Sequence, residues 1–328
     1  MKIIFFKKIL KFIFITFFVF FIVAYSLYLI SALFLTKGKI LNYNILVNYQ
    51  INFYNQLGFR NIWQTQNECV EFDNQLIFIP KIGKCFFNNP EFRTELNFTN
   101  EGRDNGNNSL KKETKNSIAV IGDSYAMGWG VNDNETFSAN LERETGIKVY
   151  NLAVSGYATE RSLLRLKKSN LIDKVKTIII QYCYNDYGEN ETHNHQNNNI
   201  DNSQKFESIL NEKLSVAKRL RKSIRYSLKI PIETIFNIKE QHNWENHEYL
   251  FEEIINKYEF LSDKKIIVIG VNGPKKNFLN FPDGNSKYIP NLKYINIDFK
   301  KEDFFIIDDH LNVSGHKKIS DELKKYID

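Results

Sequence analysis

Four short polar segments of this chain contain the residue types that attack on an ester requires. The residues are Ser124, Gly156, Asn185 and His310, and His310 directly follows two aspartates. Acyl transfer needs a nucleophile, a base within hydrogen-bond reach, an acid that orients the base, and donors that stabilise an oxyanion. The segment that contains Ser124 also fits an ordinary capped turn between a strand and a helix. The elements around the four segments have to decide between these interpretations.

Five apolar segments predict the strands that would bring these residues together. Predicted helices alternate with them, which is typical of a parallel sheet with right-handed crossovers. The first three strands end beside Ser124, Gly156 and Asn185, so we expect these residues at one edge of the sheet. His310 lies between the fifth strand and the last helix and returns to the same edge. The predicted strands cover residues 117–121, 148–154, 177–182, 265–270 and 293–297, and the predicted helices cover 134–146, 159–168 and 314–327.

In this order, the four segments resemble the sequence blocks of the SGNH/GDSL hydrolase superfamily. The resemblance covers about residues 117–328. It implies a three-layer α/β sandwich with a five-stranded parallel sheet, and no metal or other cofactor. It also implies that Ser124 is the nucleophile and that His310 is the base. The N–H of Ser124, the N–H of Gly156 and the side-chain amide of Asn185 would form the oxyanion hole.

Two positions depart from the pattern of that superfamily. Cys183 occupies the place at which the third block begins with glycine, and we expect it to be a buried packing residue. The acid of the superfamily stands three residues before the histidine, where this chain has Ile307. We therefore expect Asp308 to be the acid that orients His310, with Asp309 in reserve. For Asp309, a surface carboxylate that caps the final helix is the favoured interpretation.

The N-terminal sequence predicts a single membrane span. Residues 12–35 contain no charged side chain and exceed the length of about 20 apolar residues that crosses a bilayer as a helix. Lysines within residues 1–11 keep the N-terminus in the cytoplasm by the positive-inside rule. A cleaved signal peptide is the alternative, but its apolar core is shorter, and no clear cleavage site follows Leu35. We expect an uncleaved signal anchor in a bacterial inner membrane, with the rest of the chain in the periplasm.

Residues 36–116 are expected to form an extracytoplasmic linker and a small β-rich segment. Proline and glycine separate short apolar runs, which predict strands at residues 75–80, 84–87 and 95–98. Cys69 and Cys85 lie in the same segment. They form a disulfide if the segment lies outside the cytoplasm, and otherwise they remain two thiols.

Residues 187–262 are an insertion in the expected domain of residues 117–328. Apolar residues recur at helical spacing from Leu210 to Leu228, with basic residues between them. A helix that packs on the domain and has a solvated basic face is the favoured interpretation. A lid over the site or a basic surface beside anionic lipids is the alternative. His193 and His195 fit a polar loop better than a metal site.

The charge and the site together indicate a class of function. The net charge of +6 has no basic and aromatic platform with it, so we do not expect nucleic-acid binding. The leading hypothesis is an extracytoplasmic serine esterase or O-acyl hydrolase that acts through an acyl-enzyme on an acylated envelope carbohydrate or lipid. One alternative is an O-acetyl or acyl transferase that modifies an envelope polysaccharide, and another is a non-catalytic, carbohydrate-binding assembly subunit. His316 is expected to pack or cap a helix.

Overall fold

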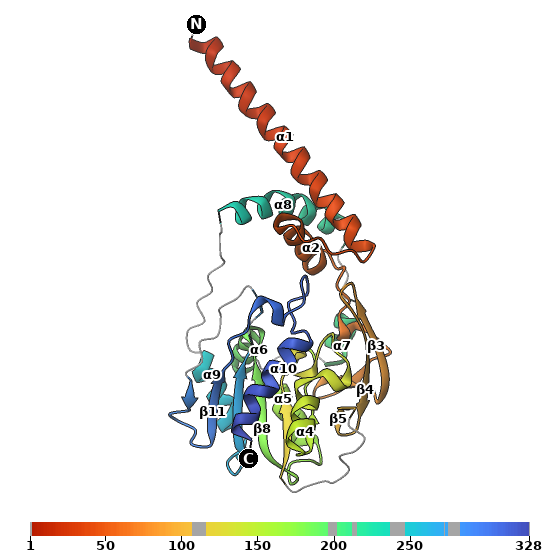
Figure 1. Cartoon of the computed structure of the whole chain (residues 1–328), viewed down its shortest axis with the longest axis vertical. Helices are drawn as coiled ribbons and strands as arrows, with labels where there is room; N and C mark the ends of the chain where they lie inside the picture. Colours follow the sequence, from red (N-terminus) through yellow and green to blue (C-terminus); the bar gives the residue numbers. More distant parts are fainter. Residues whose placement is uncertain are drawn as a thin grey trace. The chain divides into compact units, whose positions relative to one another are not determined.

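The chain divides into two compact units, which are seen in a computed structural model (Figure 1). The N-terminal unit comprises residues 1–61, 213–241 and 306–308, and the sheet unit comprises residues 62–212, 242–305 and 309–328. Residues on both sides of position 116 thus belong to the sheet unit. The structure describes residues 2–106, 116–195, 202–211, 215–236, 247–271, 273–274 and 283–327.

A nine-stranded sheet forms the centre of the sheet unit, in the order β10-β11-β9-β8-β6-β7-β5-β4-β3. A separate antiparallel pair consists of β1 (Val70–Asp73) and β2 (Ile77–Pro80). The strands of the large sheet are β3 (Gly83–Asn89), β4 (Phe92–Thr99), β5 (Gly102–Arg103), β6 (Ser117–Ile121), β7 (Val149–Asn151), β8 (Val175–Tyr182), β9 (Lys265–Gly270), β10 (Gly284–Asn285) and β11 (Leu292–Asn296).

The mixed α/β fold is confirmed, but the expectation of a complete five-stranded parallel sheet is wrong. The five predicted strands are present as β6, β7, β8, β9 and β11, and they are parallel to one another. The predicted β-rich segment extends this parallel group instead of standing apart, because β5 pairs antiparallel with β7 through Arg103 and Asn151. This pairing covers the edge that β7 would otherwise expose. Local sequence patterns do not predict which strands pair when they are this far apart in the chain.

Helices cover both faces of the parallel strands, and alternate residues of each strand face opposite sides. Ile118 and Val120 of β6 belong to one core with residues of α4 (Phe137–Thr145) and α10 (Val313–Leu323). Ala119 and Ile121 belong to a second core with residues of α5 (Thr159–Lys168) and α9 (His247–Asn256). Burial on both faces explains why β6 reads as a continuous apolar run.

Local signals explain where the main helices begin and end. The side chain of Thr136 accepts from Ala139 N, and Gly146 ends α4 in the left-handed region with φ of 72°. Asn312 caps α10 by accepting from Ser314 N and Gly315 N. The short helices are α3 (Ser124–Met127) and the 3-10 turns η1 (Trp63–Thr65), η2 (Asp133–Glu135), η3 (Glu259–Leu261), η4 (Lys301–Asp303) and η5 (Lys324–Tyr326).

Three helices make up most of the N-terminal unit: α1 (Lys2–Thr36), α2 (Asn44–Gln56) and α8 (Val216–Ile235). The span Ile4–Thr36 is long and apolar enough to cross a membrane, with a mean hydropathy of 2.5. Tyr28 of α1 is buried with Tyr49 of α2 and Ile230 of α8. Tyr49 also donates its hydroxyl to the Ser227 carbonyl at 3.0 Å. The amphipathic helix of the insertion therefore packs on α1 and α2, whereas the sequence favoured packing on the predicted hydrolase domain.

The insertion contains more helix than expected. Helix α6 (Tyr184–His195) includes the start of the stretch that the sequence assigns to a polar loop, and α7 (Asn202–Leu210) follows. The surroundings of the His193 and His195 side chains lie outside the described residues. In the β-rich segment, Cys69 and Cys85 form a disulfide, with their Cα atoms 5.2 Å apart.

Candidate active site

Ser124 lies at the end of the central strand β6, in a turn whose geometry requires glycine. Gly122 has φ of 142°, and a Cβ atom there would lie 2.8 Å from the carbonyl oxygen of Gln181. Asp123 caps the short helix α3, because its Oδ1 accepts from Tyr125 N at 2.9 Å. The turn places Ser124, which is 8% exposed, at the carboxyl edge of the sheet.

His310 is in hydrogen-bond contact with Ser124, 186 residues earlier in the chain. The Nε2 atom of His310 lies 2.7 Å from Ser124 Oγ. The imidazole ring is stacked on Trp129, with ring centroids 4.6 Å apart and planes at 12°, and it also packs beside Tyr125. The backbone holds the loop in place, because Phe305 N donates to His310 O at 3.0 Å. A serine hydroxyl at this distance from an imidazole nitrogen has the geometry of a nucleophile with its general base.

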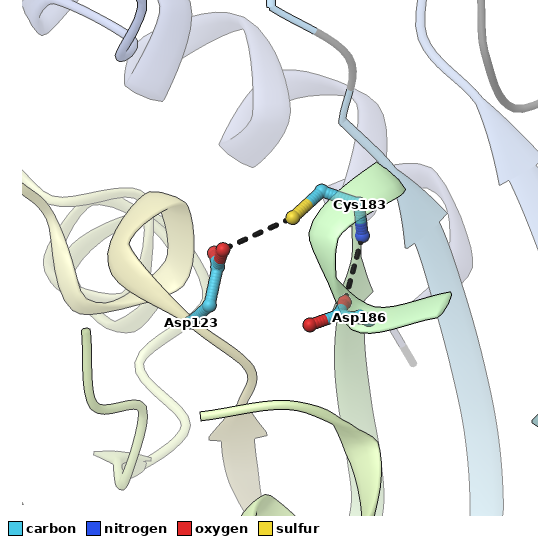
Figure 2. Close-up of side chains that lie close together, drawn as sticks. All are labelled: Asp123, Cys183 and Asp186. Carbon is cyan, nitrogen blue, oxygen red and sulfur yellow. Dashed lines mark hydrogen bonds between the residues drawn. The ribbon is translucent and has the colours of Figure 1, made fainter. Parts of the chain in front are cut away.

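Asn185 is tied to the Ser124 turn through Asp123. Asp123 Oδ2 accepts from Asn185 Nδ2 at 3.1 Å. Figure 2 shows that it also accepts from Cys183 Sγ, at 3.0 Å, and that Cys183 N donates to Asp186 Oδ2 at 2.8 Å. An amide nitrogen carries two donors, so Asn185 can give one N–H to Asp123 and keep the other for a ligand. This network ties the ends of β6 and β8 together.

The same network contains groups that burial keeps uncharged. Burial, followed by the charge of Asp123, raises the pKa of Asp186 well above its usual range. The same two causes raise the pKa of the Cys183 thiol. Ligand atoms of Asp123, Cys183 and Asp186 lie within 4.8 Å of one another, as in a metal site. However, a protonated thiol and a protonated carboxyl are poor ligands, and hydrogen bonds already join the three residues. The cluster therefore fits a structural network better than a metal centre.

Gly156 lies in the loop that follows β7, and a hydrogen bond joins this loop to the Ser124 turn. Val154 N donates to Gly122 O at 3.1 Å. Gly156 adopts the left-handed region with φ of 83°, and its carbonyl oxygen accepts from Arg161 Nη2. An ion pair also fixes Arg161, whose Nε lies 2.5 Å from Glu189 Oε1. The guanidinium therefore fixes the loop through a hydrogen bond to the carbonyl oxygen of Gly156.

The two aspartates before His310 have different partners. Asp308 is buried, and its Oδ2 accepts from the Tyr54 hydroxyl at 2.5 Å while its Oδ1 lies 3.2 Å from Arg60 Nη2. Asp309 Oδ1 lies 3.5 Å from His310 Nδ1. Asp309 does not cap the final helix, since that cap is Asn312. The expectation of a capping role for Asp309 is therefore wrong.

Sequence reasoning did not find Tyr54, Arg60 or Trp129 as residues of the site. Trp129 lies within the apolar and glycine-containing stretch after Ser124, where an aromatic ring five residues after the nucleophile was a usable signal. Tyr54 and Arg60 precede Asp308 by about 250 residues, and no pattern joins them to it. His316 is buried, and its Nδ1 accepts from Phe137 N at 3.2 Å, so it packs between helices as expected.

The chain belongs to the GDSL-like lipase/acylhydrolase family, whose sequence model matches residues 118–323. It is therefore a hydrolase that acts on ester bonds. Among solved structures, it is similar to a lipolytic protein of the G-D-S-L family from Desulfitobacterium hafniense. The two are 13% identical with a TM-score of 0.37, over 64% of this chain and 98% of the other. No curated protein matches the chain.

Proposed function

We propose that this hydrolase is a membrane-anchored, extracytoplasmic serine esterase that acts through Ser124, His310 and Asp308. The observation that supports it best is the 2.7 Å contact between His310 Nε2 and Ser124 Oγ. It occurs at the carboxyl edge of a parallel sheet, where α/β enzymes bind their ligands. The aromatic rings of Trp129 and Tyr125 hold the imidazole beside the hydroxyl.

In the first half of the reaction, Ser124 Oγ attacks the ester carbonyl carbon while His310 Nε2 takes the hydroxyl proton. The carbonyl oxygen becomes an oxyanion, which the N–H groups of Ser124 and Gly156 and the amide of Asn185 stabilise. As the tetrahedral intermediate collapses, the bond to the alcohol oxygen breaks, and His310 gives its proton to the leaving alcohol. An acyl group then remains on Ser124.

In the second half, water replaces the alcohol. His310 takes one proton from water as the oxygen attacks the acyl carbon, and the same oxyanion hole stabilises the second intermediate. Collapse breaks the bond to Ser124 Oγ, which regains its proton from His310, and a carboxylic acid leaves. Asp308, two residues before His310, is the orienting acid. The Tyr54 hydroxyl and the Arg60 guanidinium each donate a hydrogen bond to its carboxylate.

The membrane helix and the disulfide support the proposed location. Span Ile4–Thr36 exceeds the thickness of a bilayer, and lysines lie at its start. A disulfide between Cys69 and Cys85 persists in the periplasm but is reduced in most cytoplasms. We propose that the sheet unit lies in the bacterial periplasm and acts on acylated carbohydrate or lipid of the envelope.

The test uses the full chain in detergent with p-nitrophenyl acetate as substrate and a fluorophosphonate as a covalent probe. We expect the probe to label Ser124 and the substrate to be hydrolysed. Ser124→Ala should abolish labelling and lower kcat/KM by about 10³-fold or more. Ser169→Ala, at the C-terminal end of α5, is the matched control and should behave as the parent protein. Equal activity in the Ser124→Ala and parent proteins would refute Ser124 as the nucleophile.

A further inference from the structure

Gln64 lies in η1, outside the family-matched region, and its side chain reaches the loop that contains Gly156. Its Oε1 accepts from Ser155 Oγ at 3.2 Å. A Cβ atom on Gly156 would lie 3.2 Å from Gln64 Nε2. The bond to Ser155 therefore orients the amide so that its NH2 end faces Gly156, which is the proposed oxyanion donor.

The NH2 group of Gln64 has donors to spare. Within the described residues, Ser155 is the hydrogen-bond partner of this side chain, and it occupies Oε1 rather than Nε2. The carbonyl oxygen of Gly156 accepts from Arg161 instead. Gln64 is only half-buried, so a ligand can reach its amide. An amide nitrogen has two N–H groups, and both can be offered to a bound molecule.

The turn that bears Gln64 is fixed on both sides. Trp63 next to it is fully buried, and Gln66 N donates to the Trp63 carbonyl at 3.0 Å. Cys69 N donates to Gln66 O at 2.9 Å, and Cys69 is joined to β3 through the disulfide with Cys85. The Gln64 amide is therefore held in place before any ligand arrives, which lowers the entropic cost of using it.

We propose that Gln64 is a specificity-determining residue whose Nε2 donates a hydrogen bond to a substrate oxygen beside the scissile ester. This inference rests on the proposed function, because it takes Gly156 as part of the oxyanion hole. The substrate class is an ester of a polyhydroxylated alcohol, as in an acetylated sugar. Such an alcohol places further oxygen atoms next to the ester group, whereas a simple aryl acetate has none there. The β-rich segment thus contributes a substrate contact to a site whose nucleophile and base lie in the family-matched region.

The experiment compares two substrates in the full chain in detergent: glucose pentaacetate and p-nitrophenyl acetate. Gln64→Leu removes the donor. We expect KM for glucose pentaacetate to rise about 3- to 10-fold, the worth of one neutral hydrogen bond. The kcat for this substrate, and both constants for p-nitrophenyl acetate, should stay within about twofold. Where turnover of glucose pentaacetate is too slow to follow, its inhibition constant against p-nitrophenyl acetate replaces KM.

A second variant and a control make the result specific. Gln64→Glu keeps the acceptor for Ser155 and replaces the NH2 group with an oxygen, so its loss on glucose pentaacetate should be at least as large. Gln66→Leu alters the same amide type two residues away, where Nε2 donates to Ile62 O at 3.3 Å, and should match the parent protein. Thermal unfolding of each variant checks the fold.

Three results would overturn the inference. They are unchanged KM in both Gln64 variants, an equal loss of kcat on both substrates, and a parent protein that neither hydrolyses glucose pentaacetate nor is inhibited by it. Each can occur while hydrolysis of p-nitrophenyl acetate still depends on Ser124, in which case the proposed function stands. Activity that persists in Ser124→Ala would instead refute the proposed function itself.

Discussion

The proposed active site has two halves that are built in different ways. The nucleophile half consists of Ser124 with the oxyanion donors Gly156 and Asn185, and its supports are neighbouring strand ends within the sheet unit. The Asp123 carboxylate binds both Tyr125 N in the Ser124 turn and the Asn185 amide. In the base half, His310 rests on Trp129 in the sheet unit, whereas Asp308 belongs to the N-terminal unit, in which its carboxylate binds Tyr54 and Arg60.

The difference teaches that a family motif can specify one half of a site more completely than the other. The family match covers residues 118–323, so it includes every support of the nucleophile half named above. It excludes Tyr54 and Arg60, which precede it. We therefore expect changes at Tyr54 and Arg60 to act through the Asp308 carboxylate and to leave the nucleophile half unaffected.

The largest effect is expected where the two halves meet, at Ser124 and His310. Ser124→Ala and His310→Ala should each lower kcat/KM by about 10³-fold or more, because each removes one partner of a single proton-transfer step. The double variant should be no worse than either single variant. Steady-state kinetics with p-nitrophenyl acetate measure this. Losses that multiply in the double variant would mean that the two residues do not act as a unit.

The two aspartates of the base half should differ sharply. Asp308→Asn should lower kcat by about 10²- to 10⁴-fold, as expected when the group that orients the base loses its charge. Asp309→Asn makes the same substitution one residue later and serves as the matched variant. We expect it to lower kcat by less than about threefold. The reverse order of losses would move the role of acid to Asp309, which lies 3.5 Å from His310 Nδ1.

A smaller effect is expected at the partners of Asp308. Arg60→Gln and Tyr54→Phe each remove one hydrogen-bond donor of the Asp308 carboxylate, so the carboxylate should be held less firmly. The kcat should then fall about 3- to 30-fold. The measurement is steady-state kinetics with p-nitrophenyl acetate. Tyr43→Phe, at a tyrosine that is 73% exposed, is the matched control. An unchanged kcat in both variants would show that Asp308 works without these partners.

The smallest effect on activity is expected at His316. This residue lies in helix α10, and its side chain accepts a hydrogen bond from the backbone of helix α4. Burial lowers the pKa of His316 from 6.5 to about 3. Between these values the unfolded chain binds a proton that the folded chain does not, so stability falls as pH falls from 6.5 toward 3, by up to about 1.4 kcal/mol per pH unit. Above pH 6.5 the contribution is fully present.

His316→Gln tests this dependence, because it keeps an acceptor for Phe137 N but does not titrate. Thermal midpoints in detergent between about pH 4 and pH 7 should fall less steeply with acid than in the parent protein. Activity at pH 7 should change by less than about twofold, since His316 binds the scaffold and not the substrate. Equal slopes in the two proteins would contradict a buried, neutral His316.

Local sequence was sufficient for the parallel strands and for several helix ends. Ile118–Ile121 reads as a buried strand because both of its faces are covered, and Gly146 ends α4 where the sequence predicts the end of a helix. The partners of the β-rich segment were not recognisable. A hairpin at residues 83–99 has the same alternation whether it stands alone or extends a larger sheet, and only the pairing of Arg103 with Asn151 distinguishes the two.

The sequence alone indicated the residues that we propose to carry the chemistry. Serine, glycine, asparagine and histidine each follow a predicted strand, and the carboxyl ends of parallel strands lie at one edge of the sheet. The tertiary structure decided which groups support them. The contacts of Asp308 with Tyr54 and Arg60, of Gln64 with Ser155, and of His310 with Trp129 join distant parts of the chain. Such contacts depend on how whole elements pack, and packing leaves no periodic signal in the residues that it brings together.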